Sequence, residues 1–299
     1  MTKKTTVDIG RVGVWTGALD GHSTKVAQEA ARQVEAMGYG ALWIPEAVGR
    51  DPMVSAANLL SATTRIPIAT GIANIYARDP MTMVAGQRTL AEAYPNRFLL
   101  GMGVSHAHLV QRVRKHSYDR PFSYMREYLE AMEKALFMAV GPEEDPGCVL
   151  AALGPKMLEL AAAQTSGAHP YFVPVEHTAD ARRIMGPSAL LAPEQMVVLE
   201  RDPSTARGIA RKGMEVYLRA PNYVNNLKRY GFTDDDVTNG GSDRLVDAIV
   251  AWGGIDVAVA RVKAHHDAGA NHVCIQVLES DARAIPLEGW RSLASALLG

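Results

Sequence analysis

The sequence has no long apolar run, no excess of charge of either sign and only two cysteines. Hydrophobic residues make up 47% of the 299 positions, but they fall in short runs that stay below the roughly 18 apolar residues of a membrane span. Lys and Arg number 31 against 32 Asp and Glu, so the net charge of −1 supplies no basic field for nucleic acid or an anionic membrane. The composition therefore favours a small-molecule partner.

The cysteines and the N-terminus bear on the cell compartment. Cys148 and Cys274 lie far apart in strand-like contexts, so we expect two buried thiols rather than a disulfide or a metal site. The start of the chain, MTKKTTVD, lacks the apolar segment of a signal peptide, which predicts a cytoplasmic location. No Pro/Gly/Ser-rich linker or block of charge divides the sequence, so a single domain over residues 1–299 is the simpler expectation.

Residues 66–103 form the clearest structural unit. Two short apolar runs that end in glycine, 66–72 and 98–103, are typical of strands buried on both faces. Pro80 suits the first turn of a helix between them. The apolar residues of that helix at helical spacing are Met83, Val84, Leu90, Ala91 and Tyr94. Gln87 points into this apolar stripe and needs a buried partner. The unit predicts two parallel strands joined by a right-handed crossover.

Similar strands recur along the chain. The further strand-like runs are 7–15, 41–44, 148–153, 169–173, 196–199 and 272–277. Eight strands that alternate with helices favour a (β/α)8 TIM barrel over an open sheet. The connection between the last two strands is too long for one crossover, and it is expected to hold extra helices at 204–218, 222–230 and 243–252.

The carboxyl ends of barrel strands carry the reactive groups of such folds. The residues expected there are Trp15, Glu46, Gly71 to Asn74, Gly103 to His106, Leu153 to Lys156, Tyr171 to His177, Glu200 and Leu278. This set is poor in nucleophiles and in paired carboxylates, whereas glycine, small residues and aromatic residues are frequent. The pattern indicates a site that holds a flat cofactor.

Two local motifs have competing interpretations. In Leu153-Gly154-Pro155-Lys156, the glycine permits close approach of a ligand and the proline begins a helix, so the helix start can bind phosphate, with Lys156 adding charge. The alternative is an ordinary strand-to-helix turn. The pair His106-Ala107-His108 could chelate a metal, but carboxylates are missing nearby, so we expect solvated histidines and no metal. His265 and His266 are expected to be exposed on a C-terminal helix.

Eight segments recur in the order and spacing of a known family. They are GYGALWIPE (38–46), TGIAN (70–74), RDP (78–80), YPNRF with LGMG (94–103), ALGPKM (152–157), HPYFV (169–173), LAPEQ (191–195) and GSDRLV (241–246). Together they resemble the luciferase-like monooxygenase superfamily, in particular its members that use the deazaflavin coenzyme F-420. The resemblance covers nearly the whole chain and implies a bacterial luciferase-like (β/α)8 barrel with helical insertions.

The resemblance also implies a cofactor site. Gly71-Ile72 would hold the non-prolyl cis peptide that backs the deazaflavin ring, Gly103 and Val104 would line the ring or its ribityl chain, and 152–157 would receive the phosphate. The residues expected to bind F-420, or alternatively FMN, are Trp15, Gly71, Ile72, Ala73, Gly103, Val104, Ala152, Leu153, Gly154, Pro155, Lys156 and Met157.

Two residues could move a proton. Sugar-phosphate dehydrogenases of the family place a histidine after strand two and a glutamate after strand four, and this chain has the reverse, Glu46 and His106. The reversal argues against a sugar phosphate as substrate but leaves an acid and a base facing each other. The alternative for Glu46 is an ion pair with Arg50 or Arg78. The residues expected to contact substrate are Tyr76, Tyr171 and His177.

The sequence therefore predicts an oxidoreductase that transfers a hydride between F-420 and a small organic molecule. One alternative is an FMN-dependent monooxygenase of the same superfamily, and another is a protein that binds deazaflavin without turnover. A third alternative is a non-redox barrel enzyme such as a lyase or aldolase. That class would require a lysine at the end of a strand, and Lys156 is the candidate. Because relatives are commonly dimers, a homodimer is expected.

Overall fold

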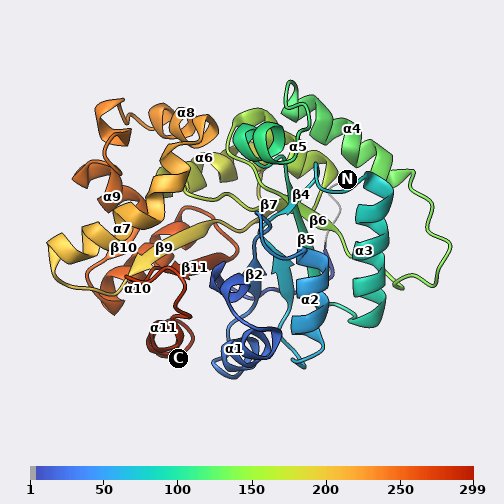
Figure 1. Ribbon diagram of the computed structural model, residues 1–299, viewed down its shortest axis with the longest axis horizontal. Helices are drawn as coiled ribbons and strands as arrows, with labels where there is room; N and C mark the ends of the chain where they lie inside the picture. Colours follow the sequence, from blue (N-terminus) through green and yellow to red (C-terminus); the bar gives the residue numbers. More distant parts are fainter. Residues whose placement is uncertain (1–4) are drawn as a thin grey trace.

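The computed structural model describes residues 5–299, and its centre is a sheet of parallel strands curled into a barrel (Figure 1). The strands are β1 (Val12–Trp15), β2 (Leu42–Ile44), β3 (Ile68–Thr70), β4 (Ala73–Asn74), β5 (Phe98–Gly103), β6 (Cys148–Leu150), β7 (Gly167–Ala168), β8 (Leu190–Leu191), β9 (Glu194–Val198), β10 (Val250–Trp252) and β11 (Val273–Val277). Their order is β10-β9-β11-β1-β2-β3-β5-β6-β7-β8, and β4 pairs with β5.

The barrel closes through β8 and β9, which are two halves of one bent strand. β8 pairs with β7, whereas β9 pairs with β11. Between the halves, the Ala192 N–H donates to the Ala168 oxygen at 2.9 Å, and the Cys274 N–H donates to the Pro193 oxygen at 3.0 Å. Hydrogen bonds thus run on both sides of this segment, and the expected barrel is confirmed.

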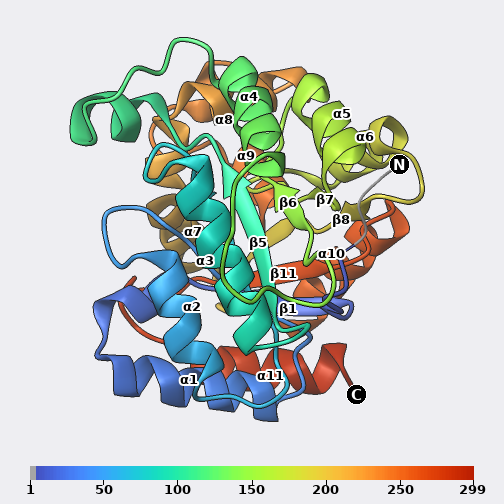
Figure 2. The same cartoon turned by 90° about the vertical axis from the view of Figure 1, so that its right-hand side faces the viewer.

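Helices surround the barrel (Figure 2). The helices after the strands are α1 (Thr24–Ala36), α2 (Pro52–Leu60), α3 (Pro80–Ala93), α4 (Pro121–Glu133), α5 (Pro155–Gln164), α6 (Val175–Met185), α10 (Ile255–Asp267) and α11 (Leu287–Leu297). Both views show α1 and α11 side by side, although they lie near opposite ends of the chain. The insertion after β9 holds α7 (Pro203–Leu218), α8 (Pro221–Arg229) and α9 (Asp243–Ile249), which gather on one side of the barrel in Figure 1.

Two predicted elements were wrong. The sixth strand is not at 169–173 but is β7, because Phe172 has a left-handed backbone with φ of +59°, which interrupts an extended ladder. The helix expected over 243–252 ends at Ile249, and Val250 begins β10, where it pairs with Met196. The β-branched pair Ile249-Val250 suits the start of a strand better than the end of a helix.

Large side chains fill the barrel interior. Trp43 on β2 is fully buried, stacks on His169 with ring centroids 4.3 Å apart, and donates its indole N–H to His272 Nε2 at 3.1 Å. Cys274 is buried beside them, whereas Cys148 is half-buried, and no disulfide joins the two. The interior is a packed core, so a ligand is confined to the carboxyl ends of the strands.

Three expectations from the sequence concern the start of the chain, membrane-spanning helices and the exposure of His265. Residues 1–4, on which the location prediction partly rests, lie outside the described residues. From residue 5 onward, no helix is long and apolar enough to cross a bilayer. His265, expected to be exposed, is buried on α10 between the Thr178 hydroxyl at 2.8 Å and the Gln195 amide oxygen at 2.9 Å, so that expectation was wrong.

Gln87 finds the buried partner that its place on α3 requires. Its amide Nε2 donates to the Gly147 carbonyl oxygen at 2.6 Å, which ties α3 to the turn before β6. Gln87→Leu would leave that carbonyl unpaired, so we expect the free energy of unfolding to fall by about 1–3 kcal/mol. Urea denaturation checks this against Thr89→Ala, an exposed neighbour on the same helix. Equal stabilities of the two variants would contradict the role given to the amide.

Candidate active site

A cavity of about 400 Å³ lies where the strand ends meet the insertion. The strand ends and the segments that follow them line it with Trp15, Pro45, Glu46, Ala47, Gly71, Ile72, Val104, Ser105, His106, Leu109, Tyr118, Ala151, Ala152, Leu153, Gly154, Met157, His169 and Tyr171, and the insertion adds Val216, Tyr217, Asn222 and Tyr223. Its volume falls in the range of small-molecule and cofactor sites.

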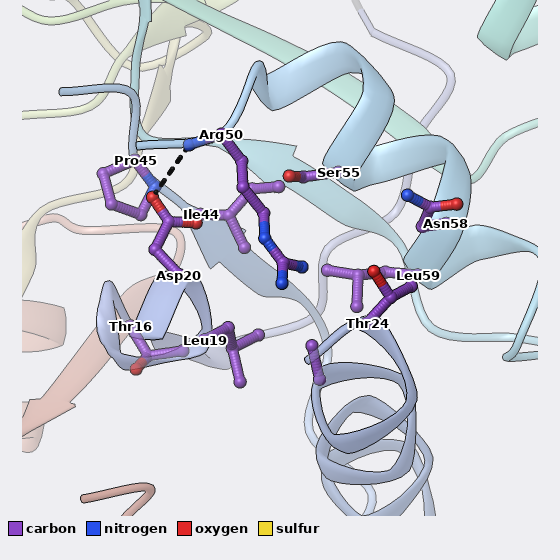
Figure 3. A pocket seen from close by; sticks show the side chains of 11 residues that line it. Thr16, Leu19, Asp20, Thr24, Ile44, Pro45, Arg50, Ser55, Asn58 and Leu59 are labelled. Carbon is purple, nitrogen blue, oxygen red and sulfur yellow. Dashed lines mark hydrogen bonds between the residues drawn. The ribbon is translucent and has the colours of Figure 1, made fainter. Parts of the chain in front are cut away.

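A second hollow lies between the ends of β1 and β2 and the helices α1 and α2 (Figure 3). Its free volume is about 10 Å³, roughly the room that one water needs. Figure 3 shows the Arg50 side chain reaching into it, with its backbone N–H directed at Asp20. The Arg50 guanidinium donates to the His22 oxygen, so Arg50 is engaged here and the hollow is too small for a ring system.

Gly71 forms the floor of the larger cavity. The Gly71-Ile72 peptide bond is cis, as the resemblance implied, and the Trp15 indole N–H donates to the Gly71 oxygen at 3.1 Å. A Cβ atom on residue 71 would lie 2.7 Å from Trp15 Nε1 and 3.0 Å from His169 Nε2. Beneath Ile72, a Cβ atom on Gly103 would lie 2.8 Å from its Cδ1 atom. Close packing therefore requires glycine at position 71, whereas a side chain at position 103 would displace the end of the Ile72 side chain.

Glu46 is held in an ion-pair network. Its side chain is 5% exposed and accepts hydrogen bonds from Arg78 at 2.8 and 3.0 Å, from Arg114 at 3.2 Å and from the Asn74 N–H at 2.7 Å. Of the two pairings considered from sequence, the one with Arg78 is present. These bonds occupy both carboxylate oxygens and fix the loop after β3 against the loop after β2.

His106 lies on the loop after β5 and faces the insertion. Its Nδ1 atom is 3.2 Å from the Asn222 Oδ1 atom of α8, and its ring is 5.3 Å from that of Tyr223. Because an amide oxygen only accepts, Nδ1 carries the proton and Nε2 keeps its lone pair. Burial lowers the pKa of His106, so the ring is a neutral base at pH 7.

Four aromatic residues form one side of the cavity, and we call Trp15, Tyr171, Tyr217 and Tyr223 the aromatic wall. Ring centroids are 5.0 Å apart for Trp15 and Tyr171, 5.0 Å for Tyr171 and Tyr217, and 5.5 Å for Tyr217 and Tyr223. The Tyr171 hydroxyl lies 2.7 Å from Gln276 Oε1 and 2.6 Å from the Tyr217 hydroxyl. Burial raises the pKa of all three tyrosines, that of Tyr217 to about 12, so the wall is uncharged at neutral pH.

Glu194 at the start of β9 supports this wall from behind. Its backbone N–H donates to the Pro170 oxygen at 2.9 Å, and its Oε2 atom accepts from the Phe172 N–H at 3.2 Å. These bonds fix the left-handed turn that directs Tyr171 into the cavity. Burial raises the pKa of Glu194 to about 8, so the side chain is a neutral acid at pH 7.

The raised pKa of Glu194 makes stability depend on pH. The folded protein keeps this proton up to about pH 8, whereas an ordinary glutamate of pKa 4.5 loses it earlier. Folding therefore takes up a proton at Glu194 in this window, and the contribution of this group to the free energy of unfolding falls as pH rises through it, by up to about 1.4 kcal/mol per pH unit. Glu194→Gln cannot ionise, so its free energy of unfolding relative to that of the wild type should rise between pH 5 and 8 in urea denaturation. The control is Glu92→Gln at an exposed position, and equal slopes for all three proteins would contradict the assignment.

The start of α5 forms a positive corner of the cavity. No side chain caps this helix end, Pro155 has no N–H, and the Met157 and Leu158 N–H groups donate to the Gly154 oxygen at 3.1 Å, which leaves the Lys156 N–H for another acceptor. The Arg229 Nη1 atom, from α8, lies 3.5 Å from the Leu153 oxygen and 3.8 Å from a Cβ atom built on Gly154. His177 Nε2 bonds the same Leu153 oxygen at 2.9 Å and holds the turn from behind. The corner suits an anion.

The structure brings together many of the residues expected at the site. Those that line the cavity are Trp15, Glu46, Gly71, Ile72, Val104, His106, Ala152, Leu153, Gly154, Met157 and Tyr171. Those that do not line it are Ala73, Tyr76, Gly103, Pro155, Lys156 and His177. Tyr76 packs 5.5 Å from Tyr118, one side chain away from the cavity, and Lys156 is exposed on α5.

Sequence reasoning missed the contribution of the insertion. Val216, Tyr217, Asn222 and Tyr223 reach the cavity from α7 and α8, and Arg229 stands at its positive corner. The signal was a helical segment too long for one crossover that carried tyrosines on both sides of a Pro221 break. His169 was also missed, because it was assigned to a strand rather than to a strand end.

A match to a family model now adds to this geometry. The model described as luciferase-like monooxygenase matches residues 7–272. The chain therefore belongs to the luciferase-like monooxygenase family, an enzyme family whose fold is the barrel described above. From residue 5 onward, no group of three or more His, Cys, Asp or Glu is placed to hold a metal, and His106 and His108 are not part of such a group.

Individual relatives are more distant. A protein of Mycobacterium tuberculosis, named as a provisional coenzyme F-420-dependent oxidoreductase, is 26% identical over 106 residues, which are 36% of this chain and 30% of the relative. The chain thus matches less than a third of that protein. Among solved structures, an F-420-dependent secondary alcohol dehydrogenase with an F-420-acetone adduct has a TM-score of 0.77 at 14% identity, covering 96% of this chain and 97% of the other.

Two further structures extend this comparison of folds. The F-420-dependent tetrahydromethanopterin reductase of Methanopyrus kandleri has a TM-score of 0.78 at 14% identity, with 98% and 99% of the two chains covered. The oxygenating constituent of 3,6-diketocamphane monooxygenase of Pseudomonas putida, in complex with FMN, has a TM-score of 0.70 at 14% identity, with 95% and 96% covered. At this identity the likeness shows a shared fold.

Proposed function

We propose that this protein is an oxidoreductase that transfers a hydride between coenzyme F-420 and a small organic alcohol or ketone. The observation that carries the proposal is one cavity that joins a glycine floor to a positive helix start. The floor at Gly71 accepts a flat ring, and the corner at Gly154 and Arg229 accepts a phosphate. A Mycobacterium tuberculosis relative named for F-420, and a solved F-420-dependent alcohol dehydrogenase of the same fold, support this choice.

The residues divide the work of holding the cofactor. In this proposal Gly71, Ile72 and Val104 contact the ring, while the Lys156 N–H at the start of α5 and the Arg229 guanidinium receive the phosphate. When bound, the deazaflavin supplies a carbon that accepts or gives a hydride. The protein contributes a water-poor cavity and a fixed orientation of the substrate.

His106 moves the proton that accompanies the hydride. As an alcohol is oxidised, its carbon loses a hydride to the cofactor and its hydroxyl proton passes to the lone pair of His106 Nε2, which leaves a ketone. In the reverse direction His106 returns that proton to the oxygen. Because hydrogen bonds from Arg78, Arg114 and Asn74 occupy Glu46, we assign proton transfer to His106 and a positioning role to Glu46.

Anaerobic turnover tests the proposal. Protein mixed with oxidised F-420 and a panel of secondary alcohols should bleach the cofactor, and reduced F-420 with the matching ketones should restore it. No change with any alcohol or ketone, despite bound cofactor, would instead favour a protein that binds deazaflavin without turnover.

FMN is the second candidate cofactor, because a monooxygenase of the same fold was solved with FMN bound. Both cofactors present a tricyclic ring and a phosphate to the same cavity. Oxygen consumption with reduced FMN, absent with reduced F-420, would favour this alternative. The expected homodimer stays a prediction that sedimentation velocity tests.

A further inference from the structure

We propose that the substrate is a neutral, mainly apolar molecule with one hydroxyl or carbonyl group, bound against the aromatic wall. This inference rests on the proposed function, which gives the glycine floor and the positive corner to the cofactor. It adds the chemical class of the substrate and the groups that would recognise it.

The ionisable side chains that line the cavity are either paired or neutral. Glu46 is neutralised by Arg78 and Arg114, and burial lowers the pKa of His169 to about 4 and that of His106 below its ordinary value. The tyrosines keep their protons. With the cofactor phosphate at the positive corner, no lining group is left with a charge to pair with an ionic substrate, and an unpaired charge is costly to bury.

The aromatic wall and the exposed Val216 beside it present apolar surface to a substrate. The rings of Tyr217 and Tyr223 meet edge to face at 87°, and Trp15 and Tyr171 are tilted by 47°, so the wall presents both ring faces and ring edges. Val216 lines the cavity although the residue is 64% exposed to solvent. An exposed valine beside an aromatic wall favours entry of an apolar molecule.

His106 and Asn222 form a hydrogen-bonded polar pair beside the aromatic wall. Because Asn222 Oδ1 accepts from His106 Nδ1, the ring is held with its Nε2 atom free to accept. A substrate hydroxyl donates its proton to Nε2, and a ketone oxygen accepts from Nε2 when His106 holds that proton. His106, held by Asn222, therefore recognises the two oxidation states that hydride transfer interconverts.

Matched probes test the substrate class. We would measure the affinity of 1-(2-naphthyl)ethanol, 2-naphthoate and 1-(2-naphthyl)ethylamine by fluorescence, with and without saturating cofactor. With saturating cofactor, which occupies the positive corner, the neutral alcohol should bind at least about tenfold more tightly than either ion, which corresponds to about 1.4 kcal/mol. Equal or tighter binding of an ion to this complex would overturn the proposal, as would displacement of bound cofactor by the alcohol.

Two sets of variants locate the binding. Tyr217→Ala should weaken the neutral probe about tenfold through loss of ring contacts, whereas Tyr217→Phe keeps the ring and the affinity. Val216→Asp should weaken it as well, while Val257→Asp, at an exposed position on α10, should not. Equal affinities for Tyr217→Ala and Tyr217→Phe, with circular dichroism unchanged, would overturn the assignment. Because the probes can bind apoprotein, neutral preference without any cofactor binding would sink the proposed function and leave the substrate class standing.

Discussion

Gly71→Ala is expected to weaken cofactor binding about tenfold or more. The new Cβ atom would lie 2.7 Å from Trp15 Nε1 and 3.0 Å from His169 Nε2, and neither ring can retreat because both are buried. The Trp15 bond to the Gly71 oxygen must then break, and the floor must rise into the cavity. Overpacking of this kind costs about 1–3 kcal/mol, which is enough to lower affinity about tenfold or more. Titration of the variant with F-420 and FMN measures the loss.

Gly208→Ala is the matched control, because a Cβ atom there meets nothing within 4 Å and the residue lies inside α7. It should bind cofactor as the wild type does and gain about 0.5–1 kcal/mol of stability from helix propensity. If Gly71→Ala binds cofactor normally while remaining folded, the ring does not rest on this floor.

His106→Asn is expected to lower turnover about 10²–10⁴-fold, the contribution typical of a positioned acid or base, and to leave cofactor affinity near wild type. In alcohol oxidation the wild-type rate should rise with pH to a plateau, with the midpoint of the rise below the ordinary histidine pKa of 6.5, because burial lowers the pKa of His106 and the neutral ring is the active form. The variant should lack this rise. Steady-state rates over a pH series, with cofactor binding measured separately, check both points.

His108→Asn, at an exposed position two residues along the same loop, is the control and should keep wild-type turnover. A collapse of cofactor affinity in His106→Asn, with turnover per bound cofactor unchanged, would show that His106 holds the cofactor and does not move the proton.

The strands and helices of the barrel could be predicted from local sequence where the hydrophobic periodicity agrees with the residues that begin or end an element. The strand at 98–103 and the helix that begins at Pro80 match the structure, because a glycine-ended apolar run and an Asp-Pro start each specify one local conformation. The sixth strand failed because 169–173 is as apolar as a strand, although the φ of Phe172 turns the chain. Its conformation depends on Glu194, which lies 22 residues away and carries no local signal.

The sequence predicts only those residues of the site that lie at the ends of strands. Gly71, Ile72 and Gly154 could be placed because the carboxyl ends of parallel strands meet at one face of a barrel. Tyr217 and Tyr223 could not, since their position depends on how α7 and α8 fold back over that face. Of the two partners of Glu46, only Arg78 could be predicted, because it lies on the adjacent loop. Arg114 follows the π-helix His108–Val113, which no motif predicts.

The central claim is that a planar redox ring occupies the glycine floor with its phosphate at the start of α5. Difference absorbance on mixing apoprotein with purified F-420, and in parallel with FMN, tests it most directly. We expect a saturable spectral change with F-420 at one ring per chain, weaker with FMN, and weakened further for both cofactors in Arg229→Gln. An unchanged spectrum with both cofactors at every concentration would contradict the account.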